Sequence, residues 1–424
     1  MTGAGMTGPG MTGPDTLEPE TDSIFELNFE SNHGHSLEPE PPPKPEPNWW
    51  TYPLSVFITS RLILAVIAFL AALALPEAGT PDKYHYAPEN LWVDQWIRWD
   101  STFFLEIASR GYQVTLDEPS NVAFFPLYPI LIRTLEPVFA NPLLAALFIS
   151  QASFLLALLI LYRTALHLFD RRSAERAVLY LSIFPTSFYF GAVYTESLFL
   201  LLSLIAFACA RARLWAFASL AVMLAAVTRP TGILLGLPLL LEWLAHRPRH
   251  RPRHRPRRSL EFTWLLTVPM GLLSFVAFLT RAFNDPLAFW NTQSAFGRRN
   301  FDPSHPLAAI YRDLEPLLRV NLQTGPVAWN VVLDLGVLAG VLILIPSIWH
   351  RLGAGWALYS LLAMLVPTAS GTGSLARYAL VIFPALLVLA RKGNDERLDR
   401  IILIVSPLLL GLLTVLFSRW VFVD

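Results

Sequence analysis

The sequence predicts an all-α protein that crosses a membrane many times, and two observations carry this prediction. Hydrophobic residues make up 54% of the 424 residues and charged residues only 15%, a balance outside the range of ordinary soluble domains. From Leu54 onward, long apolar runs alternate with short polar or proline-containing breaks. Because about 20 apolar residues are enough for a helix to cross a bilayer, we expect a bundle of membrane-spanning helices.

The apolar runs predict about eleven spans, several of them short or interrupted by proline and glycine. They fall at 54–75, 142–165, 177–193, 197–211, 214–228, 231–246, 262–282, 327–349, 355–368, 376–391 and 400–417. Interruptions such as those in SIFPTSFYFG and PTGILLGLP are tolerated where a helix lines a cavity inside the protein instead of facing lipid.

Basic residues predict which side of the membrane each loop faces. The segments 170–176, 211–213, 246–259, 350–351 and 391–400 are rich in arginine, lysine or histidine and fall on one side, which is therefore expected to be cytoplasmic. The loops 76–141, 283–326 and 368–374 then face outward, together with the TES and TRPTG junctions. We interpret 123–139 as a re-entrant or surface helix because Arg133 and Glu136 interrupt it; if it crossed the membrane, Asp100 would move to the basic side.

Two segments differ from this membrane domain, which we place at residues 48–424. Residues 1–47 repeat a short MTG unit and continue into EPEPPPKPEP, so they cannot bury a core and are expected to form a disordered tail without a secretory signal. The repeat HRPRHRPRHRPRR (246–258) either binds anionic lipid head groups or anchors the cytoplasmic side. We favour the anchor, because the prolines keep the repeat extended.

Several functional classes are not supported by the motifs. Cys209 is the only cysteine and the histidines form no paired pattern in a span, which argues against a disulfide or a metal site built from Cys and His. The chain carries neither a GxGxxG fingerprint nor a Walker loop, which argues against a nucleotide sugar bound on a Rossmann-like domain. We also expect no nucleic-acid partner.

The stretch RWDSTFFLEIASRGY (98–112) in the first outward loop places a carboxylate among aromatic residues. Drawn as one helix, Trp92, Trp96, Trp99, Phe103, Phe104 and Ile107 share an arc that includes Asp100, whereas Asp94, Arg98 and Ser101 fall on the opposite face. We therefore expect a helix on the membrane surface that holds Asp100 toward its apolar side, where poor hydration tunes a catalytic acid or base. The simpler alternative is that Asp100 caps a helix or pairs with Arg98 or Arg110.

Three further charged residues lie at the outer ends of predicted spans. Glu196 follows Tyr194 in YTES, where it would cap a helix or bind a substrate hydroxyl. Arg229 lies in TRPTG and Arg377 in SLARYALVIFP. Singly, each arginine fits an interfacial anchor, but together the two guanidinium groups would clamp a phosphate. Since a charge at the centre of a span costs roughly 2.5–3.5 kcal/mol, a shared wet cavity is the more favourable environment.

These stretches, with NVAFFPLYP, resemble in order and spacing the PIG-V-like mannosyltransferases related to GPI mannosyltransferase 2, which belong to the GT-C class of integral-membrane glycosyltransferases. The resemblance covers nearly all of residues 50–424. It implies a GT-C-like helical membrane fold, a dolichyl or polyprenyl phosphate mannose donor, and transfer on the non-cytoplasmic face. It matches Asp100 to the acid of the family's first motif, Tyr194 and Glu196 to the second motif, and Arg377 and Tyr378 to a late Arg-Tyr pair.

The chemistry of such a transfer agrees with these residues. Asp100 would deprotonate the acceptor hydroxyl in an inverting displacement, and Arg377 and Arg229 would meet the charge of the leaving phosphate. Trp99 and its aromatic neighbours would guide the lipid or stack on the sugar. No cofactor or metal is required, although Asp94 and Asp100 leave room for a divalent ion. The expected partners are membrane lipid, the lipid-linked donor, and a glycan, glycolipid or protein acceptor.

Two other classes remain open, as does the host membrane. A transporter or lipid flippase also uses broken spans and buried charges, but would often show inverted repeats, and none is evident. A non-catalytic subunit with the same fold is the other alternative, against which the intact set of acids and arginines argues. The composition, rich in proline and arginine, favours a prokaryotic plasma membrane over the endoplasmic reticulum.

Overall fold

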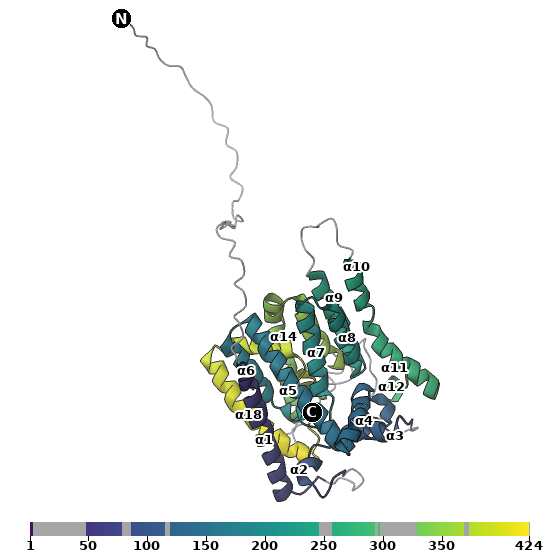
Figure 1. Ribbon diagram of the computed structural model, residues 1–424. Helices are drawn as coiled ribbons and strands as arrows, with labels where there is room; N and C mark the ends of the chain where they lie inside the picture. The colour runs from purple at the N-terminus through teal and green to yellow at the C-terminus, as the bar shows by residue number, and fades with distance from the viewer. Residues whose placement is uncertain are drawn as a thin grey trace, which may run out of the picture. The chain divides into compact units, whose positions relative to one another are not determined.

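The computed structural model describes residues 1–2, 48–78, 86–114, 119–245, 257–292, 296, 329–368 and 373–423. Within these ranges every regular element is an α-helix or a 3-10 helix, so the prediction of an all-α chain is confirmed there (Figure 1). The predicted N-terminal tail, the basic repeat, and most of the 283–326 and 368–374 loops lie outside the described residues.

Among the described residues, five helical segments are long and apolar enough to cross a membrane, judged by length and composition. They are α1 (Thr51–Ala74), α5 (Pro142–Leu168), the segment Glu261–Phe283 within α10 (Arg257–Leu265) and α11 (Val268–Phe283), Val331–Leu352 within α14 (Trp329–Leu352), and α18 (Glu396–Ser418). Shorter apolar helices are Trp215–Ala226, Pro230–Ala245 and Ala354–Thr368. The chain is thus a helical membrane protein, whereas the count of eleven spans stays a prediction.

The remaining helices are short and complete the described chain. They are α2 (Leu91–Asp94), α3 (Ser101–Arg110), η2 (Asn121–Ala123), α4 (Leu127–Phe139), α6 (Arg171–Ser182), η3 (Ser187–Phe190), α7 (Glu196–Arg211), α8 (Trp215–Ala226), η4 (Pro230–Leu235), α9 (Gly236–Ala245), α12 (Ala288–Asn291), α15 (Ala354–Thr368), α16 (Leu375–Ala379) and α17 (Phe383–Lys392).

Two predicted spans are broken where the sequence places a proline. The segment 177–193 is not one helix, because α6 ends at Ser182, three residues before Pro185. Proline has no amide hydrogen and disfavours helical geometry in the residue before it, so the helix ends ahead of it. The segment 376–391 is likewise divided into α16 and α17, with Pro384 in the first turn of α17. Both breaks leave non-helical backbone beside the site described below.

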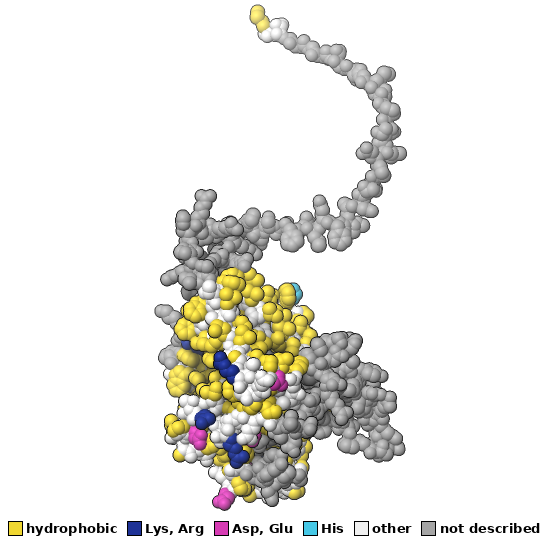
Figure 2. All heavy atoms as spheres, turned by 90° about the vertical axis from the view of Figure 1, so that its right-hand side faces the viewer, with side chains coloured by type: hydrophobic (Ala, Val, Ile, Leu, Met, Phe, Trp, Pro, Cys, Tyr) yellow, Lys and Arg dark blue, Asp and Glu magenta, His cyan; other side chains and the backbone are white. Residues whose placement is uncertain are grey.

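The core of the described bundle surrounds α7, which packs against α5, α8 and α9. Almost all of α7 is buried, which is typical of a helix enclosed by other helices. In contrast, α1, α11 and α18 expose large hydrophobic side chains, among them Leu62, Leu70, Met270, Ile404 and Leu408. Figure 2 shows hydrophobic side chains covering most of one described face, with few charges among them. This surface fits contact with lipid.

The basic segments meet at one end of the bundle. Arg176 in α6 pairs with Asp399 of α18 at 3.4 Å and donates to Asn394 at 2.6 Å, and Arg391 pairs with Asp170. From there, the 23 residues of α18 rise about 35 Å to Arg419, whose backbone oxygen accepts the amide of Ala78 beyond α1. The basic segments 170–176 and 391–400 therefore lie together, a helix length away from the first loop.

The α4 helix lies in the segment 123–139, which the sequence analysis interprets as a re-entrant or surface helix, with a membrane crossing as the alternative. Its 13 residues span about 20 Å, less than the roughly 30 Å hydrocarbon core, and it is not among the candidate spans. The hydroxyl of Tyr128 donates to the carbonyl of Ala146 in α5 at 2.9 Å, and the amide of Leu127 donates to Val227 beyond α8 at 2.9 Å. Its start is thus fixed beside α5 and the end of α8.

Gly271 and Gly340 test how closely the helices pack. A Cβ atom at Gly271 in α11 would lie 2.4 Å from the backbone oxygen of Met223 in α8, whereas one at Gly340 in α14 would meet nothing within 4 Å. We expect Gly271→Ala to push α11 from α8 and to lower the free energy of unfolding by about 1–3 kcal/mol. Gly340→Ala is the matched control, and equal melting temperatures of the two variants in detergent would contradict this packing.

Candidate active site

The first loop does not form the single surface helix predicted from its sequence. The α2 helix ends at Asp94, α3 starts at Ser101, and between them Trp99 adopts a left-handed backbone with φ of 54°. Asp94, Arg98 and Ser101, predicted on the outer face, are buried, with 2%, 0% and 0% of their surfaces exposed. The prediction was wrong because these polar residues bond to the end of α18 and to one another.

Arg98 is the residue that fixes this loop. Its Nε and Nη2 atoms donate to the carbonyl of Ser418 at 3.2 and 3.1 Å, Nη2 also donates to Gln95 at 3.2 Å, and Nη1 pairs with Asp94 at 3.3 Å. The guanidinium lies over the ring of Trp420, 4.6 Å from its centroid. Burial lowers the pKa of Arg98 to about 10, against the opposing effect of Asp94, so the side chain stays charged at neutral pH.

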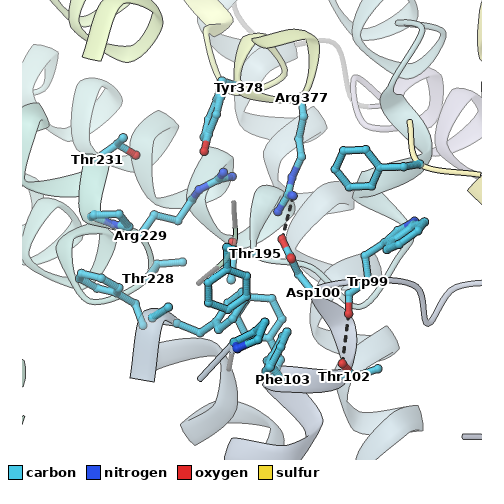
Figure 3. Close-up of a pocket in the computed structure, with 18 of the residues that line it drawn as sticks. Trp99, Asp100, Thr102, Phe103, Thr195, Thr228, Arg229, Thr231, Arg377 and Tyr378 are labelled. Atoms are coloured by element: carbon cyan, nitrogen blue, oxygen red, sulfur yellow. Dashed lines mark hydrogen bonds and ion pairs between the residues drawn. The ribbon is translucent and has the colours of Figure 1, made fainter. Parts of the chain in front are cut away.

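Asp100 follows this anchor and takes neither of the simpler roles considered for it. It occupies the N-cap position of α3 but makes no side-chain capping bond there. Its Oδ2 instead accepts from Nη1 of Arg377 at 2.9 Å, across 277 positions of sequence. Figure 3 shows the two side chains pointing toward each other. The Asp100 side chain remains 28% exposed, so solvent or substrate can reach it.

This pair belongs to a row of four charged side chains, which we call the charge row: Asp100, Arg377, Glu196 and Arg229. Nε of Arg377 donates to Oε1 of Glu196, and Nη1 of Arg229 donates to the same oxygen at 3.0 Å. Glu196 is fully buried, and its Oε2 has no hydrogen-bond partner among the residues that the structure describes. The structure thus brings together Asp100, Glu196 and both arginines, all four of which the sequence analysis selected.

Aromatic rings support the two guanidinium groups. The Arg377 guanidinium lies 4.5 Å from the ring centroid of Tyr194 and 5.0 Å from that of Tyr189, and Arg229 lies 5.2 Å from that of Tyr378. The hydroxyl of Tyr194 donates to the carbonyl of Arg98 at 2.8 Å. Tyr194 therefore joins the first loop to the charge row. These contacts fix both arginines by cation–π attraction as well as by ion pairing.

The charge row borders a cavity of about 500 Å³, a size typical of small-molecule sites. Asp100, Arg377, Arg229, Tyr378 and Trp99 line it, whereas Glu196 and Tyr194 lie behind its wall. Its aromatic side is formed by Phe103, Phe124, Phe125, Phe296, Trp420 and Phe422. The lining of the cavity therefore combines charged and aromatic side chains.

Four threonines on the cavity wall were missed by the sequence reasoning: Thr102, Thr195, Thr228 and Thr231 (Figure 3). Each stands beside a residue that was selected or within the same short motif. A threonine in an apolar chain has no periodicity or charge to distinguish it, so only its adjacency to YTES and TRPTG could have drawn attention to it. Their hydroxyl groups add small polar surfaces next to the arginines.

Local backbone geometry explains the TRPTG sequence. The amides of Thr228 and Arg229 both donate to the carbonyl of Ala225, at 3.0 and 3.1 Å, which ends α8 and turns the chain toward the cavity. A Cβ atom at Gly232 would lie 2.1 Å from that same carbonyl oxygen. Only glycine allows this approach, and η4 then begins with Pro230 directly after Arg229.

The acids near the cavity offer little for a metal ion. Asp94 accepts the amide of Ala87 at 3.1 Å and pairs with Arg98, and it does not line the cavity. Among the described residues there is no group of three or more His, Cys, Asp or Glu side chains that could hold a metal. Asp100 and Arg377 instead place a carboxylate beside a guanidinium, which suits proton abstraction next to a bound anion.

Comparison with known proteins confirms the resemblance for part of the chain. Residues 55–236 match the family model described as "Mannosyltransferase (PIG-V)". GPI mannosyltransferase 2 of Drosophila pseudoobscura pseudoobscura is 27% identical over 169 residues, which cover 34% of this chain and 36% of the relative. The protein of that name from Yarrowia lipolytica is 29% identical over 186 residues, covering 43% and 50%. The chain thus spans between about a third and a half of the length of these relatives.

Solved structures that are similar to this chain share little sequence identity with it. The Archaeoglobus fulgidus oligosaccharyltransferase in complex with Zn and sulfate is 15% identical, with a TM-score of 0.45, over 85% of this chain and 53% of that one. ArnT from Cupriavidus metallidurans bound to undecaprenyl phosphate is 17% identical, with a TM-score of 0.41, over 80% and 60%. Because both TM-scores lie below 0.5, the function proposed below rests on the family match and the geometry of the cavity.

Arg98 generates a prediction about the stability of this site. Arg98→Ala would remove the guanidinium that pairs with the buried carboxylate of Asp94 and donates to the carbonyl of Ser418, so we expect it to lower the free energy of unfolding by about 3–5 kcal/mol. Arg110→Ala, at the exposed end of α3, is the control and should unfold like the unaltered chain. Unfolding temperature and limited proteolysis in detergent measure both. A stable Arg98→Ala variant would show that the loop is held by other contacts.

Proposed function

We propose that this chain, which matches the PIG-V mannosyltransferases over residues 55–236, is a membrane glycosyltransferase that moves a hexose from a polyprenyl or dolichyl phosphate sugar to an acceptor hydroxyl. Mannose is the sugar that the family match favours. The observation that carries the proposal is the pair of Asp100 and Arg377, 2.9 Å apart on the wall of one cavity. A base and a counter-charge for phosphate stand side by side there.

The proposed reaction is a single displacement that inverts the anomeric carbon. The acceptor oxygen attacks that carbon while its proton passes to Asp100, and the bond from the carbon to the phosphate oxygen breaks. The lipid phosphate leaves as an anion, so no general acid is needed. Asp100 suits this role because its side chain reaches the cavity, whereas Glu196 is fully buried behind it.

The two arginines would bind the phosphate of the donor. Arg377 and Arg229 both line the cavity, and both donate to the same oxygen of Glu196, which holds the guanidinium groups next to each other. Nη2 of Arg377 makes no hydrogen bond to any residue that the structure describes, so it can donate to a phosphate oxygen without breaking the pair with Glu196. In this proposal Glu196 and Tyr194 position the arginines and do not contact the sugar.

The aromatic side of the cavity would receive the remainder of the donor. The ring of Trp99 contacts those of Trp420 and Phe422 edge to face, with ring centroids 5.6 and 5.0 Å apart, and all three residues line the cavity. Rigid ring surfaces of this kind stack on sugars and also accommodate isoprenoid chains. Tyr378, on the wall beside Arg229, offers a hydroxyl group to the sugar or the phosphate.

The cavity is proposed to open on the non-cytoplasmic side. In support, the basic residues near Arg176 and Arg391 gather at the start of α18, while Trp420 lies on the cavity just beyond its end. Positive residues favour the cytoplasmic side. The same orientation applies to a prokaryotic plasma membrane, which the composition favours, and to the endoplasmic reticulum. The acceptor would be a glycan, glycolipid or protein on that side.

Asp100→Asn tests the proposed base. Because the amide cannot take the proton, we expect the rate of hexose transfer from radiolabelled polyprenyl phosphate mannose to the lipid or protein fraction of membranes to fall by about 10²- to 10⁴-fold. Protein abundance should be unchanged.

Glu106→Gln is the matched control for that experiment, since Glu106 lies in α3, which begins directly after Asp100, but does not line the cavity. It should transfer at the unaltered rate. Equal transfer by Asp100→Asn would remove Asp100 from the mechanism. Absence of transfer by the unaltered chain with mannose and glucose donors would argue for a transporter or a non-catalytic subunit instead.

We further propose that transfer requires no metal ion, since the arginines meet the charge of the phosphate and Asp94 is paired with Arg98. Treatment of the membranes with EDTA should therefore leave the transfer rate unchanged. A loss of transfer that Mg²⁺ or Mn²⁺ restores would contradict this and would favour a metal bound by the substrate phosphate.

A further inference from the structure

A carboxylate inside a candidate membrane span has no part in the mechanism above. Asp334 of α14 is 1% exposed, and its Oδ1 accepts the backbone amide of Ala376 at 2.6 Å. A charge within an apolar span costs roughly 2.5–3.5 kcal/mol, so such residues usually serve a function. Asp334 does not line the cavity, and its contact lies one residue before Arg377.

The short helix that carries Arg377 depends on partners outside itself. α16 has five residues, and Ser374 at its N-cap position has a left-handed backbone (φ 70°) and makes no side-chain capping bond. The first amides of a helix need an acceptor, normally supplied by the N-cap residue. Asp334 supplies that acceptor from another helix.

A second segment bonds the carbonyl of Ala376, whose amide is bonded by Asp334. The hydroxyl of Thr186, fully buried in the break between α6 and η3, donates to the carbonyl of Ala376 at 3.0 Å. This carbonyl belongs to the peptide unit that contains the nitrogen of Arg377. The backbone leading into Arg377 is therefore bonded on one side by α14 and on the other by the segment that continues to Tyr194 and Glu196.

We propose that Asp334, together with Thr186, is a positioning residue that sets where the Arg377 guanidinium lies between Asp100 and Glu196. The inference rests on the proposed function, in which Arg377 binds the donor phosphate. Asp334 would then control the affinity for the donor without touching it. A residue that only stabilised the bundle would affect folding but would not act through Arg377.

The test compares full-length chains in membranes: unaltered, Asp334→Leu, Asp334→Asn, Arg377→Gln, and the double variant Asp334→Leu/Arg377→Gln. Asp334→Leu removes the acceptor, so we expect the KM for polyprenyl phosphate mannose to rise about tenfold with the acceptor KM unchanged. Asp334→Asn keeps an oxygen that accepts the Ala376 amide and should restore most of the donor affinity. In the Arg377→Gln background, Asp334→Leu should raise the donor KM no further.

Asp170→Leu is the matched control, because it removes a carboxylate paired with Arg391 at the opposite end of the bundle and should leave the donor KM unchanged. An unaltered donor KM in Asp334→Leu, or an equal rise with and without Arg377, would overturn the inference. If Asp334→Leu does not reach the membrane, Thr186→Val serves as a second variant, and it should also raise the donor KM.

A stability measurement separates this inference from the proposed function, because it needs no donor. The unfolding temperatures of the unaltered chain, Asp334→Leu, Arg377→Gln and the double variant form a double-mutant cycle. If Asp334 places Arg377, the loss in the double variant is smaller than the sum of the single losses. Additive losses would overturn the positioning role even if transfer is observed, whereas coupled losses with no transfer by the unaltered chain would reject only the proposed enzyme activity.

Discussion

The pairing of charges within an apolar bundle is the constraint on which the site depends. An isolated charge is unfavourable in such surroundings, so the two acids and two arginines of the charge row are each other's necessary partners. Asp100, Glu196, Arg229 and Arg377 come from four separate segments of the chain. Their mutual pairing therefore fixes the first loop, α7, the end of α8 and α16 relative to one another, and it forms one wall of the cavity.

Interrupted helices bring these charges to one place. Glu196 starts α7 after a non-helical stretch, Arg229 lies between α8 and η4 ahead of a proline, and Arg377 lies in a helix of five residues. Each interruption turns backbone or side-chain polar groups inward, where another segment satisfies them: Arg98 bonds Ser418, and Asp334 and Thr186 bond Ala376. Broken backbone at membrane depth is stable only where the protein supplies such partners.

The sequence was informative where chemistry is local and less so where it depends on distant segments. Apolar runs predicted the helical membrane architecture. Short polar motifs in the first loop and at the ends of predicted spans identified Asp100, Glu196, Arg229 and Arg377, which the structure brings together. Helical periodicity failed in the first loop, because Arg98 bonds a carbonyl 320 positions away and the chain turns at Trp99 to allow it. The sequence analysis did not select Asp334 for a similar reason. The amide that it accepts belongs to Ala376, 42 positions away, in a helix whose N-cap residue makes no side-chain capping bond.

The balance of the charge row bears on how a reaction cycle would end. Two unpaired arginines would bind a lipid phosphate tightly after transfer as well as before it, and slow departure of that product would then limit turnover. Here each guanidinium already has a carboxylate partner. The binding free energy of a phosphate is therefore only the difference between its bonds to the arginines and the bonds to carboxylates that it replaces. In the proposed reaction, Asp100 would return to Arg377 when the phosphate departs. The charge row would thus compete with the lipid phosphate for the arginines and favour release of that product.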